Sequence, residues 1–409
     1  MDISVDAATE QRLDLYVRGV GSLLANKTQR AAFAMYAMGL LGAGERKSIE
    51  PIAARASADP GACSALEQRI GNFLTSAPWD DFRVRTYAAE YALSEMTRHR
   101  PVHSWIVDDT GFLKQGKHSV GVDRQYTGSA GKTTNCQVAV SLTVATTSAH
   151  LPIDFALYLP DSWTENPARR AEARIPEYVV FQTKLELALT MIRRAKDNGV
   201  PPGVVLVDCA YGNAHWFRNE LRMLGLDYSV AIQGTTNVVR LDRLERRRGQ
   251  VVSAQLLAEQ LVEQRKFRRC TWREGTRKGL SARFAAVRVI AGYEDKWSDL
   301  RDREALWLLI EWLDGDDRPT KFYLSSLPAG LSRIKLVRTT KERYRTERAY
   351  EDLKGEIGLD HYEGRRWPGW NHHITVALCC FAFIVAEHER RFPPSAGRSQ
   401  GHGPHAVAA

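Results

Sequence analysis

Four acidic residues stand where a catalytic metal site can be assembled. Asp108 and Asp109 follow one apolar run, Asp208 follows another, and Glu347 lies in the helical stretch 343–357. Carboxylates gathered round one point repel each other unless a cation neutralises them. Ligands that are all oxygen favour Mg²⁺ or Mn²⁺ over zinc. Two such ions, about 3.5–4 Å apart, can clamp the attacking and leaving oxygens of a phosphodiester.

The helix predicted over residues 339–357 separates into two stripes at about 100° per residue. Its apolar stripe is fit for a core and consists of Thr346, Ala349, Tyr350, Leu353 and Ile357. Beside it, Arg343, Glu347, Glu351 and Lys354 form a narrow charged stripe. An acid flanked by cations suits a metal ligand beside a phosphate chain, and the plain alternative is a solvated face with ion pairs. Each lone Asp likewise has a plain alternative as a turn residue or helix cap, so the site rests on the combination.

The elements that must position these acids follow from hydrophobic patterns. The predicted strands cover residues 104–109, 135–146, 151–159, 203–208 and 227–232, and the helices between them cover 178–197 and 213–224. This order is β-β-β-α-β-α-β, a meander followed by parallel strands with helical crossovers. The first and fourth strands can then be neighbours, and each ends in acid. Their carboxyl ends lie at the edge where open α/β sheets place ligands.

The rest of the chain is assigned by the same patterns. We expect a helical DNA-binding or dimerisation region (1–100), a first core segment (101–234), a β-rich basic insertion (235–330), the last core helices with the third acid (331–392) and a disordered tail (393–409). For the first region, a plain helical cap on the core is an equal alternative. The fold class is therefore α/β, a mixed sheet flanked by helices.

Composition points to a polyanionic partner and a reducing compartment. The net charge is +9 and the isoelectric point is about 9.2, which favours nucleic acid as the partner. The six cysteines form no C-x-x-C pair, so neither a zinc site nor a disulfide framework is indicated and a cytoplasmic protein is expected. The longest apolar run, residues 374–386, is too short to span a bilayer, so no membrane partner is expected.

Together these motifs resemble one family. An apolar strand with Asp108, Asp109 and Thr110, the stretch 205–212 with Asp208, and Arg343-x3-Glu347-x6-Lys354 are similar to the DDE insertion-sequence transposases. The branch is the one with a Tyr-Arg-Glu-Lys signature and a β-rich insertion before the last acid. The resemblance covers roughly residues 100–390. The Tyr expected three residues before Arg343 is Thr340 here, although Tyr344 lies close.

The resemblance implies an RNase H-like core and a transposase activity. Metal-activated water would cleave DNA at the terminal inverted repeats of a mobile element, and the freed 3′-hydroxyl would attack target DNA. The catalytic and metal-binding residues would be Asp208, Glu347 and either Asp108 or Asp109, holding two Mg²⁺ or Mn²⁺ ions. The partner would be double-stranded DNA, both element ends and target, held by a homodimer, since joining two ends needs two active sites.

DNA contacts are also implied by the resemblance. Arg343 and Lys354 would contact phosphates near the scissile bond, with Tyr344 beside them. Arg365, Arg366 and Trp367 offer cations and an aromatic ring for backbone contact and base stacking, and a structured loop that packs its tryptophans is an equal alternative. A tryptophan of the insertion, Trp272 or Trp297, would receive a flipped base at the cut end.

Two motifs point elsewhere and are set aside. Residues 128–133 look like part of a phosphate-binding loop, but Tyr126 stands where that motif needs glycine, so a turn before the second strand is expected. The adjacent His372 and His373 point apart on a helix, which favours packing or surface roles over metal binding.

Two other functions fit the same residues. One is a nuclease of this fold without strand transfer, which product analysis on paired-end DNA would separate. The other is an inactive, transposase-derived DNA-binding regulator, which a metal-dependent nicking assay would detect.

Overall fold

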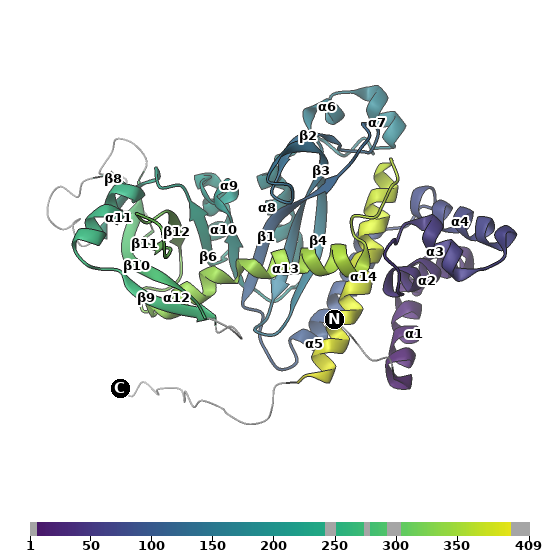
Figure 1. Ribbon diagram of the computed structural model, residues 1–409, viewed down its shortest axis with the longest axis horizontal. Helices are drawn as coiled ribbons and strands as arrows, with labels where there is room; N and C mark the ends of the chain where they lie inside the picture. The colour runs from purple at the N-terminus through teal and green to yellow at the C-terminus, as the bar shows by residue number, and fades with distance from the viewer. Residues whose placement is uncertain (1–5, 242–250, 274–278, 293–303, 394–409) are drawn as a thin grey trace.

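The protein was analysed as a computed structural model, which describes residues 6–241, 251–273, 279–292 and 304–393. The amino-terminal part is helical, as expected (Figure 1). It contains α1 (Ala7–Ser22), α2 (Lys27–Leu41), α3 (Ile49–Ala56), α4 (Pro60–Thr75) and α5 (Asp81–Met96). Side chains of Asp6, Asn26, Asp59 and Asp80 cap four of these helices by accepting backbone N–H groups. Helices α2, α4 and α5 pack on the carboxy-terminal helix α14 (Trp367–Arg391).

The described residues form one 12-stranded sheet. Its first strands are β1 (Ser104–Leu113), β2 (Asp123–Thr127), β3 (Lys132–Ala145), β4 (His150–Tyr158), β5 (Val204–Val207) and β6 (Tyr228–Ile232). Strand β3 lies antiparallel between β1 and β4, whereas β1, β5 and β6 run parallel in that order. The predicted RNase H-like mixed sheet flanked by helices is therefore confirmed, including the pairing of the first and fourth predicted strands.

The strands of the 235–330 segment extend this same sheet (Figure 1). They are β7 (Asn237–Arg240), β8 (Val252–Ser253), β9 (Arg268–Arg273), β10 (Leu280–Ala291), β11 (Leu306–Trp312) and β12 (Lys321–Ser325), with helix α11 (Ala254–Glu263). Strand β12 pairs antiparallel with β6, with Phe322 opposite Ile232. The segment is thus joined edge to edge to the core sheet. The basic run at 243–248 lies outside the described residues.

Two predicted boundaries were wrong, and one strand was missed. Strand β1 does not end at its acids but continues to Leu113, because β3 pairs with it along its whole length while β5 stops at the register of Ile106. Helix α8 (Lys184–Asp197) starts six residues later than expected, because Thr183 and Glu186 form a capping box there. The sequence also gave no signal for β2, whose hairpin with β3 turns at residues 128–131.

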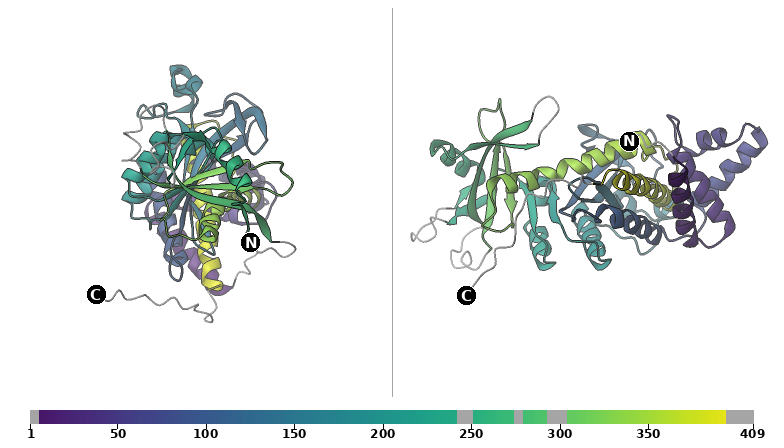
Figure 2. Two further views of the ribbon diagram at one scale, coloured as in Figure 1. Left: turned by 90° about the vertical axis from the view of Figure 1, so that its left-hand side faces the viewer. Right: turned by 90° about the horizontal axis from the view of Figure 1, so that it is seen from below.

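The single helix predicted over 339–357 is a rod of four parts. It consists of α12 (Arg333–Thr340), the 3₁₀ turn η3 (Lys341–Arg343), α13 (Tyr344–Asp352) and the π-helical turn η4 (Leu353–Ile357). Figure 2 shows it running from the insertion strands across the core. Its five predicted core residues are all buried: Thr346, Ala349, Tyr350, Leu353 and Ile357. The rod therefore carries residues 341–354 along one face of the sheet.

Helix α14 fills the space between the sheet and the amino-terminal helices. Among the described helices it is the one long and apolar enough to cross a membrane, yet 89% of its apolar window is buried inside the protein. His372 and His373 lie within it and are buried, bonding the Leu74 carbonyl and the Tyr36 hydroxyl respectively. Their role is therefore packing, one of the two expected. All six cysteines are free thiols.

Candidate active site

The two adjacent acids of β1 point to opposite faces of the sheet, because side chains alternate along a strand. Asp108 faces the rod, where its Oδ2 accepts a 2.6 Å hydrogen bond from Nη1 of Arg343. Asp109 faces α8, where its Oδ2 accepts a 2.8 Å bond from Nζ of Lys184. Only Asp108 therefore lies on the face that carries Glu347.

Arg343 joins Asp108 to Glu347. Its second terminal nitrogen donates to Oε1 of Glu347 at 3.0 Å, so one guanidinium lies between carboxylates from two distant parts of the chain. The Glu347 side chain is 56% exposed, which leaves it open to a ligand from solvent, whereas that of Asp108 is 13% exposed.

Asp208 shares a pocket with Glu347 and Arg343. It follows β5 directly and caps the short helix α9 (Cys209–Gly212), where its Oδ1 accepts the Ala210 N–H at 2.9 Å. The pocket has a volume of about 450 Å³ and is bounded by β5, β6, β12 and the η3–α13 part of the rod. Among the described residues no cation pairs with Asp208. Its second oxygen is thus available at the pocket wall.

The pKa of Asp108 is raised to about 7, chiefly because the carboxyl group is buried. Arg343 lowers this pKa, and the nearby carboxylates Asp208 and Asp109 raise it. A carboxyl group that titrates near neutrality in a cleft is a candidate for function.

The donor set fits a divalent metal ion in chemistry, although not in its present arrangement. Asp108, Asp208 and Glu347 offer only oxygen atoms, which suits Mg²⁺ or Mn²⁺. Within the part of the chain that is described, no three acidic, histidine or cysteine side chains are grouped to hold a metal. The guanidinium of Arg343 lies between two of the three candidate ligands. A metal bound by all three would thus require Arg343 to move.

Lys354 turns onto β1 beside the acids. Its Nζ donates to Oγ1 of Thr110 and to the Gly111 carbonyl, both at 2.8 Å, and burial lowers its pKa.

Gly111 is needed here, because a Cβ atom at this position would lie 2.0 Å from Oγ1 of Thr127. The turn at 128–131, set aside above as a phosphate loop, thereby packs against the strand of the acids.

The other predicted DNA contacts do not line the acid pocket, apart from Tyr344. The ring of Tyr344 carries Arg273 4.5 Å from its centroid. Arg365 is exposed, Arg366 precedes α14, and Trp367 lines a second pocket at the other side of β4. Trp272 packs its ring under Lys341, 4.6 Å away, and Trp297 lies outside the described residues.

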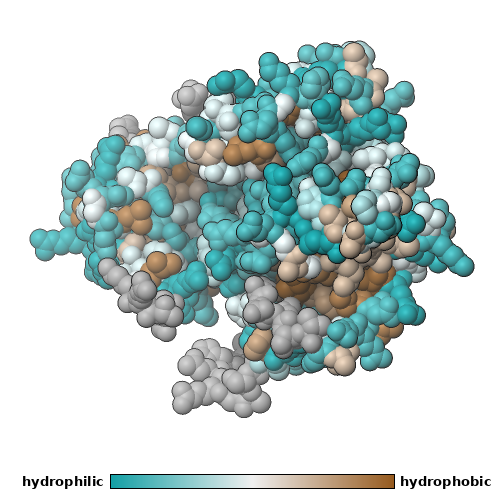
Figure 3. Space-filling view, turned by 45° about the vertical axis from the view of Figure 1, so that its right-hand side comes forward, coloured by the Kyte–Doolittle hydropathy of each residue, from teal (hydrophilic) through white to brown (hydrophobic). Residues whose placement is uncertain are grey.

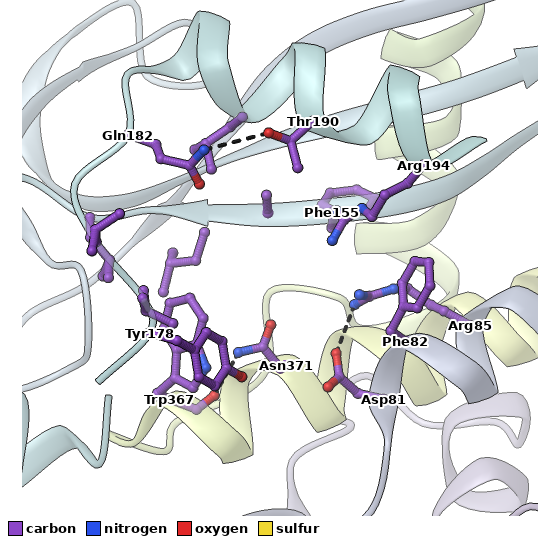
Figure 4. A pocket seen from close by; sticks show the side chains of 16 residues that line it. Asp81, Phe82, Arg85, Phe155, Tyr178, Gln182, Thr190, Arg194, Trp367 and Asn371 are labelled. Atoms are coloured by element: carbon purple, nitrogen blue, oxygen red, sulfur yellow. Dashed lines mark hydrogen bonds and ion pairs between the residues drawn. The ribbon is translucent and has the colours of Figure 1, made fainter. Parts of the chain in front are cut away.

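That second pocket has nearly the same volume, about 440 Å³, and lies between α5, α8, β4 and the start of α14 (Figure 4). The two arginines that line it, Arg85 and Arg194, are both paired with carboxylates. Asp81 of the lining lies 3.2 Å from Arg85, and the buried Asp154 lies 3.5 Å from Arg85 and accepts a 2.6 Å bond from Arg194. The face seen in Figure 3 is mostly hydrophilic, with its apolar side chains gathered in a few recesses.

Three charged residues near the candidate acids were missed by sequence reasoning. Lys184 was hidden inside a helix predicted to begin earlier. Lys341 lines the pocket, and its partner Glu311 is fully buried in β11. A signal for Glu311 existed: it is the one charged residue in the otherwise apolar strand 306–312. A lone acid in such a strand requires a partner.

Comparisons with known proteins identify the family. The sequence model described as DDE superfamily endonuclease matches residues 20–279. The chain is 30% identical over 238 residues to the probable transposase for insertion sequence element IS701 of Microchaete diplosiphon. That match spans 58% of each chain, so this chain covers little more than half the length of its curated relative.

Solved structures are more distant. The cryo-EM structure of the piggyBac transposase synaptic complex with hairpin DNA aligns with a TM-score of 0.46 at 10% identity, over 89% of this chain and 66% of that one. The NurA nuclease from Sulfolobus solfataricus aligns with a TM-score of 0.21 at 10% identity, over 64% and 81%. Likenesses at this level carry no argument about function.

Proposed function

This chain belongs to the DDE superfamily endonucleases, and from that premise we propose that it is a transposase that cleaves and joins DNA at the terminal inverted repeats of an insertion sequence. The observation that carries the proposal is that Asp208 and Glu347 line one pocket together with Arg343, whose guanidinium also bonds Asp108. Enzymes of this superfamily generally use divalent metal ions. We propose two Mg²⁺ or Mn²⁺ ions here, held by these three carboxylates.

Asp108 is the better candidate for the first ligand. It lies on the face of Arg343 and Glu347, whereas Asp109 lies on the opposite face and is paired with Lys184. We assign Asp109 a positioning role, because its ion pair ties β1 to the first turn of α8. Lys354 acts similarly from the other side by holding Thr110.

Arg343 has two possible partners in this scheme, the protein's carboxylates and the DNA phosphates. Bound to DNA, its guanidinium would turn from Asp108 and Glu347 to a phosphate oxygen, to which it can donate two parallel bonds. With Arg343 turned away, Asp108, Asp208 and Glu347 would be free to hold the metal ions, which would activate water and neutralise the charge that develops on the phosphate. Until DNA binds, Arg343 occupies the place between Asp108 and Glu347.

A dimer on two DNA ends is the assembly that concerted joining needs, since one chain carries one such site. We propose a cytoplasmic location, because the six free thiols fit a reducing compartment. Tyr344, Arg365, Arg366 and Trp367 remain proposed DNA contacts.

The test is product analysis with paired-end DNA, made from the sequence that flanks the gene, in Mg²⁺ and in EDTA. A transposase gives metal-dependent nicks at the element ends and joined products with a second duplex. Nicks without joined products would identify a nuclease of this fold. Binding without nicks in any divalent metal would identify a DNA-binding regulator and refute the proposal.

A further inference from the structure

Glu311 is a carboxylate buried beneath the acid pocket. It lies in β11 and is fully inaccessible to solvent. Its two oxygens accept bonds of 2.8 and 3.1 Å from Nζ of Lys341, and Oε2 also accepts a 2.9 Å bond from the hydroxyl of Tyr323 on β12. Lys341 and Tyr323 both line the pocket. A buried charge held this completely fixes the position of the groups that bond to it.

Lys341, which Glu311 holds, is the first residue of the 3₁₀ turn η3. Each residue of that turn is attached to a different part of the molecule. Lys341 is attached to the insertion strands through Glu311. Glu342 bonds Arg345 and lies 3.4 Å from His103, just before β1. Arg343 holds Asp108 and Glu347. A short 3₁₀ stretch inside a longer helix often marks a functional hinge.

The rod on either side of the turn is fixed by other contacts. Before it, the hydroxyl of Thr340 pairs with Ser229 of β6 at 2.7 Å. After it, Thr346 pairs with Thr143 and Tyr350 with Ser141, both residues of β3. These neutral contacts hold α12 and α13 to the sheet. The turn itself, which aims Arg343, is bound from the insertion side by the charged pair of Glu311 and Lys341.

We infer that Glu311 is a positioning residue for the acid site: by holding Lys341 from below, it fixes η3 so that Arg343 and Glu347 face Asp108 and Asp208. The inference rests on the proposed function, whose metal ligands it concerns. In this scheme β11 and β12 of the insertion do more than extend the sheet, because they also fix the positions of the residues at the catalytic edge. Catalytic groups generally need support within about 0.5 Å from the residues behind them.

The experiment compares four full-length variants with the wild type: Lys341→Met, Glu311→Gln, the double variant Glu311→Leu Lys341→Met, and Asp314→Asn. The last is a matched control, since Asp314 is three residues from Glu311 but forms an exposed pair with Arg269. Two properties are measured. One is the rise of the melting temperature with MnCl₂ in the absence of DNA. The other is nicking of a plasmid that carries the DNA flanking the gene.

A merely structural pair and a positioning pair predict different results. Lys341→Met leaves a buried charge alone and lowers the melting temperature, whereas the double variant removes both charges and restores it. If Glu311 positions the site, the double variant still needs about tenfold more MnCl₂ for half of the stabilisation and nicks about 100-fold more slowly. Asp314→Asn matches the wild type in both properties.

The inference would be overturned if the double variant recovered its nicking rate and its Mn²⁺ response along with its melting temperature. Should the double variant stay unstable, Glu311→Gln decides, because it keeps the shape and loses the charge. A wild-type Mn²⁺ response in that variant would overturn the inference, and a tenfold weaker one supports it. Absence of nicking by the wild type would refute the proposed function instead, while the Mn²⁺ titration would still decide the role of Glu311.

Discussion

Two pockets of nearly equal volume, about 450 and 440 Å³, differ in how their charges are balanced. In the pocket between α5, α8 and α14, both lining arginines are paired with carboxylates, Arg85 with Asp81 and Arg194 with the buried Asp154. At the edge of β1 and β5, Arg343 is shared by two carboxylates and Asp208 has no cation partner among the described residues. Size does not separate the two pockets, and the pairing of their acids does.

The difference has a physical consequence. Balanced charges in a part-buried place stabilise a geometry, whereas unbalanced ones store repulsion that a bound cation relieves. The pKa of Asp108 is raised mainly by burial, and Asp208 and Asp109 add to the rise while Arg343 opposes it. The four predictions that follow test whether the acid pocket at the edge of β1 and β5 is catalytic and whether the pocket between α5, α8 and α14 is structural.

The largest expected effect is on cleavage. Glu347→Gln keeps the shape of the side chain and loses the charge that would hold a metal, so we expect cleavage to fall by roughly 1000-fold or more while DNA binding persists. Single-turnover cleavage and a gel shift measure the two. The matched variant in the second pocket is Asp81→Asn, which should cleave at the wild-type rate. Wild-type cleavage by Glu347→Gln would rule out this acid as a ligand.

The second prediction concerns stability. Asp154 is buried between two arginines, so Asp154→Ala leaves Arg194 without its carboxylate and Arg85 with Asp81 alone, and should cost about 3 kcal/mol of folding free energy. Urea unfolding measures the loss. Glu347→Gln, on the exposed wall of the other pocket, should change stability little. Equal losses in the two variants would mean that the acid site is as structural as its counterpart.

The sequence predicted the acid pocket better than the other pocket, and the reasons are physical. The period of α13 correctly predicted which side chains are buried, and strand patterns brought Asp108 and Asp208 to neighbouring strands, because both signals are local. The pairing of Arg343 with Asp108 joins residues 235 positions apart and depends on how the rod crosses the sheet. The 3₁₀ turn η3 was not predicted, and the contact that Lys341 makes there with Glu311 on a distant strand leaves no local pattern in the sequence.

The balanced pocket was not predicted at all. Asp154 sits in the alternating strand β4, where a single acid looks like an outward-facing residue. Its partners Arg85 and Arg194 come from two helices far away in the chain. The pairing of such charges is known only once the positions of the helices are known. Sequence patterns therefore identify candidate metal ligands more easily than the ion pairs that neutralise buried acids.

The third prediction uses pH. The pKa of Asp108 in the folded protein is about 7, above the 3.8 of an ordinary aspartate. The folded state therefore holds a proton that the unfolded chain releases, and stability falls as pH rises from about 4 to 7. In EDTA, Asp108→Asn should raise the melting temperature more at pH 8 than at pH 5. Asp109→Asn, which removes the partner of Lys184, should not raise it. A pH-independent effect of Asp108→Asn would show that this carboxyl is not strained.

The smallest expected effect is on the salt dependence of DNA binding. Arg343 and Lys354 are held by groups of the protein in the absence of DNA. If each turns to a phosphate, Arg343→Ala and Lys354→Ala should each reduce the slope of log affinity against log salt by about 1. Arg348→Ala is the control, because Arg348 lies on the same helix but is exposed and pairs with Glu351. Binding is measured in EDTA, so that changes in metal affinity do not contribute. An unchanged slope for Arg343→Ala would mean that its guanidinium stays with the two carboxylates in the complex. Since a metal held by all three acids requires Arg343 to leave them, that result would also count against metal binding by Asp108 and Glu347 together.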